Sequence, residues 1–404
     1  MNETVTAGSS PRKIRQNNIV AALQTLYVHR CLSRAELARK LGMNRSSSGE
    51  IVSDLTSGGY IREADDVSRA GGLQSRAGRP GIMLEIIPDA AYFVGVELGV
   101  EHISTAVIDL TGDVRACRKI AFDTPSSSPE EAMKRGVDLA LDAMPKDMVA
   151  RCRGLGISTP AHIRSDGVVS LAPIIGWRDI PLADLGRSVF PANVPIVIEN
   201  DANAFAIGDS YRHGTSGVTL FLLMETGVGG GIMIDGKLFR GGHGLAGEIG
   251  HTLVPGSGGQ KFEQLIGREL ILRQYREATG RADAELQELI DEVRDRVPDA
   301  VNIAEKWSRH LAYALLQACR LIDPDRIVLG GSVASLYPMV AARVASHMAE
   351  GQVIAFPSPD IVVDDDADFG SAFGAACILH QRFLSLENEE FGGDDSIPSP
   401  SSYP

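Results

Sequence analysis

The sequence has few of the residues that mark secreted, membrane-spanning or cysteine-rich metal proteins. Its 404 residues include five scattered cysteines and no Cys-x-x-Cys pair. Neither a disulfide framework nor a cysteine-built zinc site is therefore expected. No apolar run approaches the roughly 20 residues that a membrane-spanning helix needs. The polar N-terminus lacks the apolar core of a signal peptide. These absences favour a protein of the reducing cytoplasm, with no membrane partner.

Positive charge is also scarce, because the net charge is −13. That balance alone argues against a nucleic-acid partner. The N-terminal region differs, since nine Lys or Arg and three acidic residues lie between Ser10 and Arg62. A local basic patch, rather than the global charge, sets the attraction to phosphates. This region is therefore a candidate DNA-binding domain in a chain long enough for two or three domains.

Three helices are predicted within this basic region. Apolar residues recur at helical spacing over 17–27, which predicts the first helix. Ser33 and Glu36 have the spacing of a capping box at the start of a second helix. Asn44 is a suitable cap for a third helix that extends to residue 55. Two helices joined by a tight turn are the helix-turn-helix pattern.

Two strands, at 60–61 and 83–86, are expected to flank a glycine-rich loop and complete a winged helix-turn-helix. The front of the third helix would face the DNA major groove. An arginine in the Gly-Arg-Pro sequence at 78–80 suits a narrow, A·T-rich minor groove. The candidate DNA-binding residues are Arg45, Ser46, Ser47 and Arg79. A small helical domain that contacts protein is the alternative, which the basic patch opposes.

From residue 91 onward, strands alternate with helices, which predicts an α/β fold of two lobes with a cleft between them. Strands are expected at 92–99, 104–108, 116–122, 154–158, 195–198, 218–224, 230–234 and 326–329. Long helices are expected at 129–144, 299–322 and 371–383.

Two short polar runs are the strongest functional signal in this region. Residues 199–204 read Glu-Asn-Asp-Ala-Asn-Ala, and residues 246–251 read Ala-Gly-Glu-Ile-Gly-His. Carboxylate, amide and imidazole groups bind vicinal hydroxyls well, because a sugar hydroxyl both donates and accepts hydrogen bonds. Asp201 could also take a proton from a hydroxyl nucleophile.

Each polar residue has an ordinary alternative when it is considered singly. Asp201 has the position of a helix N-cap, which is a common role for aspartate. His251 could be a hydrogen-bonded core histidine, and Glu248 and Glu263 could be surface charges.

Taken in order along the chain, these motifs resemble the ROK family of repressors and sugar kinases. The matching segments are 172–173, 176–177, 199–204, 226–231, 244–251 and 323–331, within a resemblance that extends from about residue 15 to about residue 383. The resemblance implies an actin-like fold of the sugar kinase and ribonuclease H type, preceded by the winged helix-turn-helix. It also implies that a sugar contacts Asn200, Asp201, Glu248, His251 and Glu263. A homodimer or homotetramer on a pseudo-palindromic operator is expected.

The sequence departs from the family pattern at three places, two of which argue against catalysis and one against zinc. ROK kinases begin their fold with Asp-x-Gly-Gly-Thr, whereas this chain has Glu-Leu-Gly-Val-Glu at 97–101. A glycine of the second phosphate loop is replaced by Glu225. Two added carboxylates should repel nucleotide phosphates, so Asp201 would be a vestigial base. The cysteine cluster that holds zinc in many ROK proteins is missing after His251, so no metal and no cofactor is expected.

The sequence thus predicts a sugar-responsive transcriptional regulator, a repressor, whose effector is a sugar or sugar phosphate. The alternative is an ATP-dependent hexose kinase that also binds DNA. The expected organisation is a disordered tail at 1–14, a winged helix-turn-helix at 15–90, a sugar-sensing domain at 91–386 and a disordered acidic, Ser/Pro-rich tail at 387–404. One lobe of the sensing domain would comprise 91–205 with the helix at 371–386, and the other 206–370.

Overall fold

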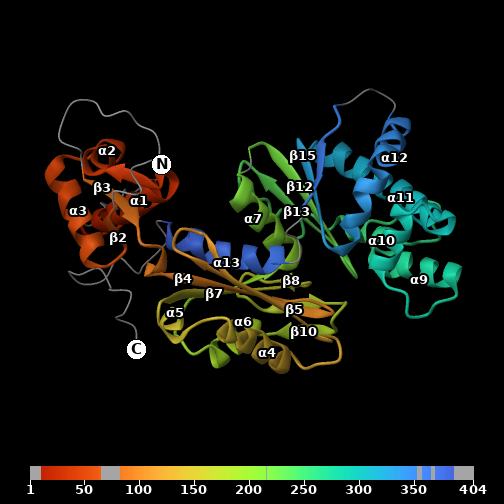
Figure 1. The fold of residues 1–404 in the computed structure, drawn as a ribbon, viewed down its shortest axis with the longest axis horizontal. Helices are drawn as coiled ribbons and strands as arrows, with labels where there is room; N and C mark the ends of the chain where they lie inside the picture. The colour runs from red at the N-terminus through yellow and green to blue at the C-terminus, as the bar shows by residue number, and fades with distance from the viewer. Residues whose placement is uncertain (1–10, 65–81, 215, 353–356, 365–368, 386–404) are drawn as a thin grey trace, which may run out of the picture.

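A computed structural model describes residues 11–64, 82–214, 216–352, 357–364 and 369–385. The candidate minor-groove residue Arg79 and most of both expected tails lie outside these described residues. Figure 1 shows an N-terminal unit beside two lobes, each built on a β-sheet. Within the part of the chain that is described, no helix is both long and apolar enough to cross a bilayer.

The N-terminal unit contains three helices and a small antiparallel sheet of strand order β1-β3-β2. Its elements are α1 (Pro11–His29), β1 (Cys31–Ser33), α2 (Arg34–Lys40), α3 (Arg45–Ser57), β2 (Ile61–Glu63) and β3 (Met83–Ile86). The capping box of Ser33 with Glu36 forms as predicted, and Asn44 caps α3. Helix α1 begins at Pro11, within the segment expected to be a tail, because proline is well suited to the first turn of a helix.

Lobe 1 is built on a five-stranded sheet of order β11-β7-β4-β5-β6. Strands β4, β5 and β6 are antiparallel neighbours, whereas β7 and β11 are parallel to β4. The strands are β4 (Tyr92–Leu98), β5 (His102–Asp109), β6 (Val114–Ala121), β7 (Cys152–Thr159) and β11 (Ile196–Asn200). A second, three-stranded sheet and three helices complete the lobe: β8 (His162–Ile163), β9 (Val169–Ala172), β10 (Trp177–Ile180), α4 (Pro129–Asp142), α5 (Lys146–Ala150) and α6 (Leu182–Val189).

Lobe 2 repeats this strand connectivity in a sheet of order β14-β13-β12-β15-β16. Its strands are β12 (Val218–Met224), β13 (Val228–Ile234), β14 (Lys237–Leu238), β15 (Arg326–Gly330) and β16 (Asp360–Val363). Its helices are η3 (Ile249–His251), α8 (Glu263–Ile266), α9 (Arg268–Thr279), α10 (Leu286–Arg294), α11 (Pro298–Ile322), η4 (Ser332–Leu336) and α12 (Tyr337–Glu350). The repeated order is the two-lobed α/β architecture that the sequence predicts.

Two helices, α7 (Asp201–His213) and α13 (Gly370–Phe383), pack closely together between the lobes (Figure 1). Helix α13 also contacts β4 and β7, whereas α7 contacts β13. Their close approach depends on Gly374, where an added Cβ would lie 1.7 Å from the carbonyl oxygen of Ala204. The expected lobe boundary at 205/206 falls inside the continuous helix α7, which therefore connects the two lobes.

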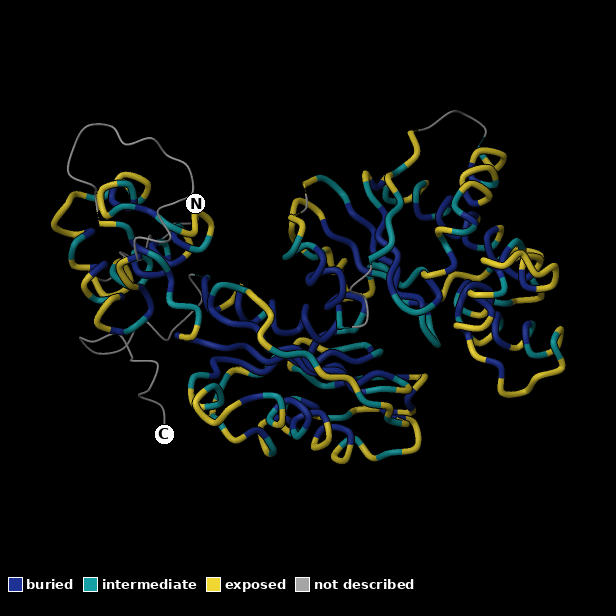
Figure 2. The backbone as a smooth tube through the Cα atoms, in the orientation of Figure 1, coloured by how far each residue is buried: buried dark blue, intermediate teal, exposed yellow. Residues whose placement is uncertain are grey.

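One apolar core joins the N-terminal unit to lobe 1. Buried side chains of α1, α3 and β3 belong to the same cluster as residues of β4, α7 and α13. At its centre Phe383 packs against Tyr60 and Phe93, with ring centroids 6.2 and 5.4 Å apart. Figure 2 shows the same dark, buried stretches running through both sheets and through α13. The N-terminal unit thus packs against the end of α13 and shares an apolar core with lobe 1.

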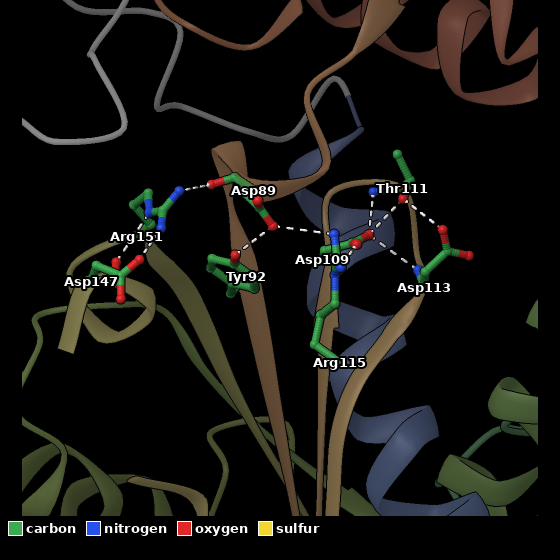
Figure 3. Close-up of polar contacts among 8 residues, drawn as sticks. All are labelled: Asp89, Tyr92, Asp109, Thr111, Asp113, Arg115, Asp147 and Arg151. Atoms are coloured by element: carbon green, nitrogen blue, oxygen red, sulfur yellow. Dashed lines mark hydrogen bonds and ion pairs between the residues drawn. The ribbon is translucent and has the colours of Figure 1, made fainter. Parts of the chain in front are cut away.

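Polar contacts fix the end of lobe 1 that faces the N-terminal unit (Figure 3). The buried carboxylate of Asp109 accepts hydrogen bonds from the backbone N–H of Thr111, at 2.8 Å, and from Arg115 Nε, at 2.5 Å. Arg115 and Tyr92 both reach Asp89, just before β4. From the N-terminal unit, Arg30 donates to the carbonyl oxygen of Thr111 at 3.0 Å. The turn between β5 and β6 therefore contacts the N-terminal unit at the end of α1.

Candidate functional site

All five predicted sugar-binding residues line one cavity of about 170 Å³ between the lobes. Asn200 and Asp201 lie where β11 meets α7, Glu248 and His251 lie at η3, and Glu263 begins α8. Strands and helices from both lobes therefore bring together residues that are separated by up to 63 positions in the chain. The same cavity is lined by Val100, Glu101 and Glu225, the residues that depart from the phosphate-loop sequences of ROK kinases.

The start of α7 separates the roles of two neighbouring residues. Asn200, not Asp201, is the N-cap, because its Oδ1 accepts the backbone N–H of Asn203 at 3.1 Å. The capping alternative for Asp201 is therefore wrong. Burial raises the pKa of Asp201 to about 7, and the negative charges of Glu97 and Glu248 add to the effect. A carboxyl group with such a pKa can accept a proton near neutral pH.

Glu248, His251 and Glu263 form a chain of polar contacts along one wall. His251 Nδ1 lies 3.8 Å from Glu248, and His251 Nε2 lies 3.5 Å from Glu263. The imidazole of His251 is 40% exposed, which excludes the core-histidine alternative. Lys261 Nζ lies 3.3 Å from Glu263. These groups offer both donors and acceptors toward the cavity, as vicinal hydroxyls require.

His162 is a further member of this wall that was not predicted from the sequence. It comes from β8 of lobe 1, and its Nδ1 lies 3.5 Å from Glu248 of lobe 2. Ligand atoms of His162, Glu248 and His251 all lie within 4.8 Å of one another. A structural zinc site needs four ligands, whereas this group supplies three. A histidine with no neighbouring motif gives no signal in the sequence, so only the approach of the two lobes reveals it.

The carboxylate of Glu225 occupies hydrogen-bond donors at the start of η4. Glu225 accepts the backbone N–H and the hydroxyl of Ser332, both at 2.7 Å. The first backbone N–H groups of a helix have no partner within the helix and are a common binding site for phosphate. In this chain the carboxylate of Glu225 is bonded to these donors.

Glu101 is held in an ion pair that spans the two lobes. It lies in the turn between β4 and β5, and its carboxylate accepts a hydrogen bond from Arg268 Nη1 at the start of α9. Val100 packs against the apolar core of lobe 1. The turn at Glu101 thus serves as a contact between the lobes.

The glycines at 227–231 allow close packing within the protein. An added Cβ at Gly229 would lie 2.8 Å from Cβ of Ala202, and one at Gly230 would lie 2.3 Å from the carbonyl oxygen of Gly247. The segment forms the antiparallel hairpin of β12 and β13. Glycine is therefore required here by the fold, as the sequence interpretation allowed.

The candidate major-groove residues Arg45, Ser46 and Ser47 are exposed on the first turn of α3. Ser48, the next residue, is buried against the unit's core. The backbone geometry of α3 is thus compatible with a recognition helix that presents three polar side chains.

A two-lobed domain with a polar cavity at the lobe boundary is typical of proteins that bind a small molecule there. The ROK family model matches residues 93–382. This chain belongs to the ROK family, and it has the actin-like fold of that family's sugar kinases and regulators.

Curated relatives include both regulators and enzymes. A xylose repressor of Caldicellulosiruptor bescii is 30% identical over 60% of this chain, which spans 59% of that relative. A xylose repressor of Bacillus spizizenii is 26% identical over 92% of this chain and 97% of its own length. A glucokinase of Halalkalibacterium halodurans is 26% identical over 73% of this chain and 97% of its own length.

Solved structures show the same division. A ROK family transcriptional regulator, a homolog of the E. coli Mlc protein, superimposes with a TM-score of 0.72 at 19% identity, covering 93% of this chain and all of that chain. A ROK family glucokinase from Streptomyces griseus in complex with glucose and AMPPNP superimposes with a TM-score of 0.63 at 25% identity. The match covers 72% of this chain and all of that chain. The longer match with the regulator includes the N-terminal unit.

Proposed function

We propose that this protein is a sugar-responsive transcriptional repressor that no longer phosphorylates its sugar. The observation that carries this proposal is the contrast within one cavity. The five polar residues expected to contact a sugar are assembled there. Glu225 and Glu101, which replace residues of the kinase phosphate loops, line the same cavity and are bonded to Ser332 and Arg268. Repressor relatives that align along nearly the whole chain support the same assignment.

In this proposal the N-terminal unit is a winged helix-turn-helix that binds operator DNA. Arg45, Ser46 and Ser47 are exposed at the start of α3 and contact base edges in the major groove. Arg79 enters the flanking minor groove, for which A·T-rich sequence is favourable. A pseudo-palindromic operator bound by a homodimer or homotetramer, in the cytoplasm where the DNA lies, belongs to the same proposal.

A continuous set of packed elements connects the cavity to the DNA-binding unit. Ser371 Oγ of α13 donates to the backbone carbonyl of Asp201 at 3.0 Å, directly at the cavity. At the other end of α13, the carbonyl oxygen of Leu384 accepts a hydrogen bond from Gln24 of α1 at 2.5 Å. His380 of α13 also packs on Tyr27 of α1, with centroids 5.2 Å apart. A sugar that moves the start of α7 would therefore shift α13 and its contacts with α1.

A sugar kinase that also binds DNA is the second candidate. Its support is the raised pKa of Asp201, about 7, which suits a general base for a sugar hydroxyl. Phosphoryl transfer also requires donors and cations that position the phosphates. In this chain Ser332 is bonded to Glu225 and Arg268 to Glu101, which supports the repressor over the kinase.

The proposal is tested by selecting a duplex from a random pool with the full-length protein and following its binding by fluorescence anisotropy. A panel of sugars should change the affinity for the selected duplex, and a coupled assay with magnesium-ATP should show no turnover. Asp201→Ala and Glu248→Ala should remove the sugar response and leave the affinity without sugar unchanged. Turnover near 1 s⁻¹, about the lower end for kinases, would instead establish the kinase.

A further inference from the structure

The cavity carries far more negative than positive charge. Six carboxylates line it, contributed by both lobes: Glu97, Glu101, Asp201, Glu225, Glu248 and Glu263. Lys261 is the one lysine or arginine among the described lining residues, and Arg268 reaches Glu101 from the adjacent helix α9. Three histidines, His102, His162 and His251, complete the titratable lining.

The cations at this site already have carboxylate partners. Lys261 is within 3.3 Å of Glu263, and Arg268 pairs with Glu101. His102 Nε2 lies 3.4 Å from Glu97. Burial lowers the pKa of His102, but the hydrogen bond and charge of Glu97 outweigh this and raise it above the ordinary value. An anionic ligand would have to compete for each of these cations with a protein carboxylate.

Side chains that line the cavity are also bonded to nearby backbone N–H groups. At η4 the donors of Ser332 are bonded to Glu225. At α7 the backbone N–H of Ala202 is bonded to Asp201, at 2.9 Å, and that of Asn203 to the cap Asn200. These N–H groups are the usual backbone partners of a phosphate at a helix start. Here, acidic and amide side chains have taken them.

We propose that the effector is a sugar without a phosphate or carboxylate group, either neutral or an amino sugar, and that the cavity rejects phosphorylated sugars. This inference rests on the proposed sugar-sensing function and specifies its ligand. Hydroxyls donate well to carboxylates, and an ammonium group adds a charge-assisted hydrogen bond. A phosphate ester carries a charge of about −1.5 to −2 at pH 7 and meets like charge from both lobes.

Calorimetry on the full-length protein tests this with matched probes. Glucose, mannose, xylose, N-acetylglucosamine and glucosamine are each measured beside their terminal phosphate ester, and glucose also beside glucuronate. The tightest-binding neutral or amino sugar should bind at least about tenfold more tightly than its own phosphate. The gap should narrow at high salt, because screening weakens the repulsion. A phosphate ester that binds as tightly as its parent sugar overturns the inference while leaving a sugar sensor intact. Failure of every probe to bind refutes the sugar sensor itself, and this inference with it.

A charge-neutral variant separates electrostatics from shape. The double substitution Glu101→Gln with Glu225→Gln keeps the side-chain volumes and removes two negative charges from the cavity lining. It should improve binding of the matched phosphate ester at least tenfold relative to wild type. Glu130→Gln, at an exposed position on α4, is the matched control and should leave both affinities unchanged. The electrostatic cause is contradicted if the double variant gains no affinity for the phosphate ester, or if Glu130→Gln raises that affinity by the same factor.

Discussion

The carboxyl group of Asp201 should make the stability of the protein fall as pH rises. Its pKa is raised from 3.8 to about 7, first by burial and then by the charges of Glu97 and Glu248. The unfolded chain keeps the ordinary value, so between these two values the folded state holds a proton that the unfolded state has lost. The stabilisation is therefore complete below about pH 4 and is lost as pH rises through about 7.

The size of this effect follows from the width of that pH interval. At about 1.36 kcal/mol per pH unit, the change from 3.8 to about 7 corresponds to about 4 kcal/mol. The side chain is half-buried, so solvent screening makes this an upper value. Asparagine cannot ionise, so Asp201→Asn should gain stability relative to wild type as pH rises from about 4 to about 8.

Denaturant unfolding at a series of pH values, followed by tryptophan fluorescence, measures the difference between the two proteins. Trp177 in lobe 1 and Trp307 in lobe 2 are both buried, so each lobe has a reporter. Asp138→Asn on α4 is the control, since Asp138 is 43% exposed and pairs with Lys134 on the same helix. A stability difference between wild type and Asp201→Asn that stays constant across this pH range would refute the reasoning.

Three further predictions concern the DNA-binding unit, its connection to the cavity and the metal content. Arg45→Ala should reduce the difference in binding free energy between the preferred and other bases by about 1–3 kcal/mol, if the contact to guanine is bidentate, and Arg79→Ala should weaken binding most on A·T-flanked duplexes. Fluorescence anisotropy at fixed salt measures both affinities, with Arg118→Ala at an exposed position as the control. Unchanged affinities in both variants would exclude the winged-helix assignment. Phe383→Ala should lower the free energy of unfolding by about 3–5 kcal/mol and reduce the effect of sugar on DNA binding. Leu253→Ala, at a position that is 62% exposed, should do neither. An intact sugar response in a folded Phe383→Ala protein would exclude α13 as the connection between the cavity and the DNA-binding unit. Elemental analysis should find no stoichiometric zinc, because the cysteine cluster that holds zinc in many ROK proteins is missing after His251. One zinc per chain would instead show that His162, Glu248 and His251 bind the metal as a three-ligand site.

Much of the architecture was predictable because it depends on local patterns. Short apolar runs identify β4, β5, β12 and β15, and the amphipathic spacing identifies α4 and α11. The caps Ser33 and Asn44 act through hydrogen bonds to residues three positions away, which any sequence window contains. Six short strands, β1, β8, β9, β10, β14 and β16, were not predicted, because two to four residues carry too little periodicity.

The sequence by itself determined which chemical groups are available for a sugar and which replace the phosphate loops. Those groups occur in compact motifs, so their identity is a local property of the chain. Tertiary structure decided what the groups do. It brought His162 to Glu248, placed Glu225 on the donors of Ser332, and paired Glu101 with Arg268. Each of these contacts joins residues about 90 to 170 positions apart. Such contacts form only when the two lobes and the helices between them pack, so no local pattern records them.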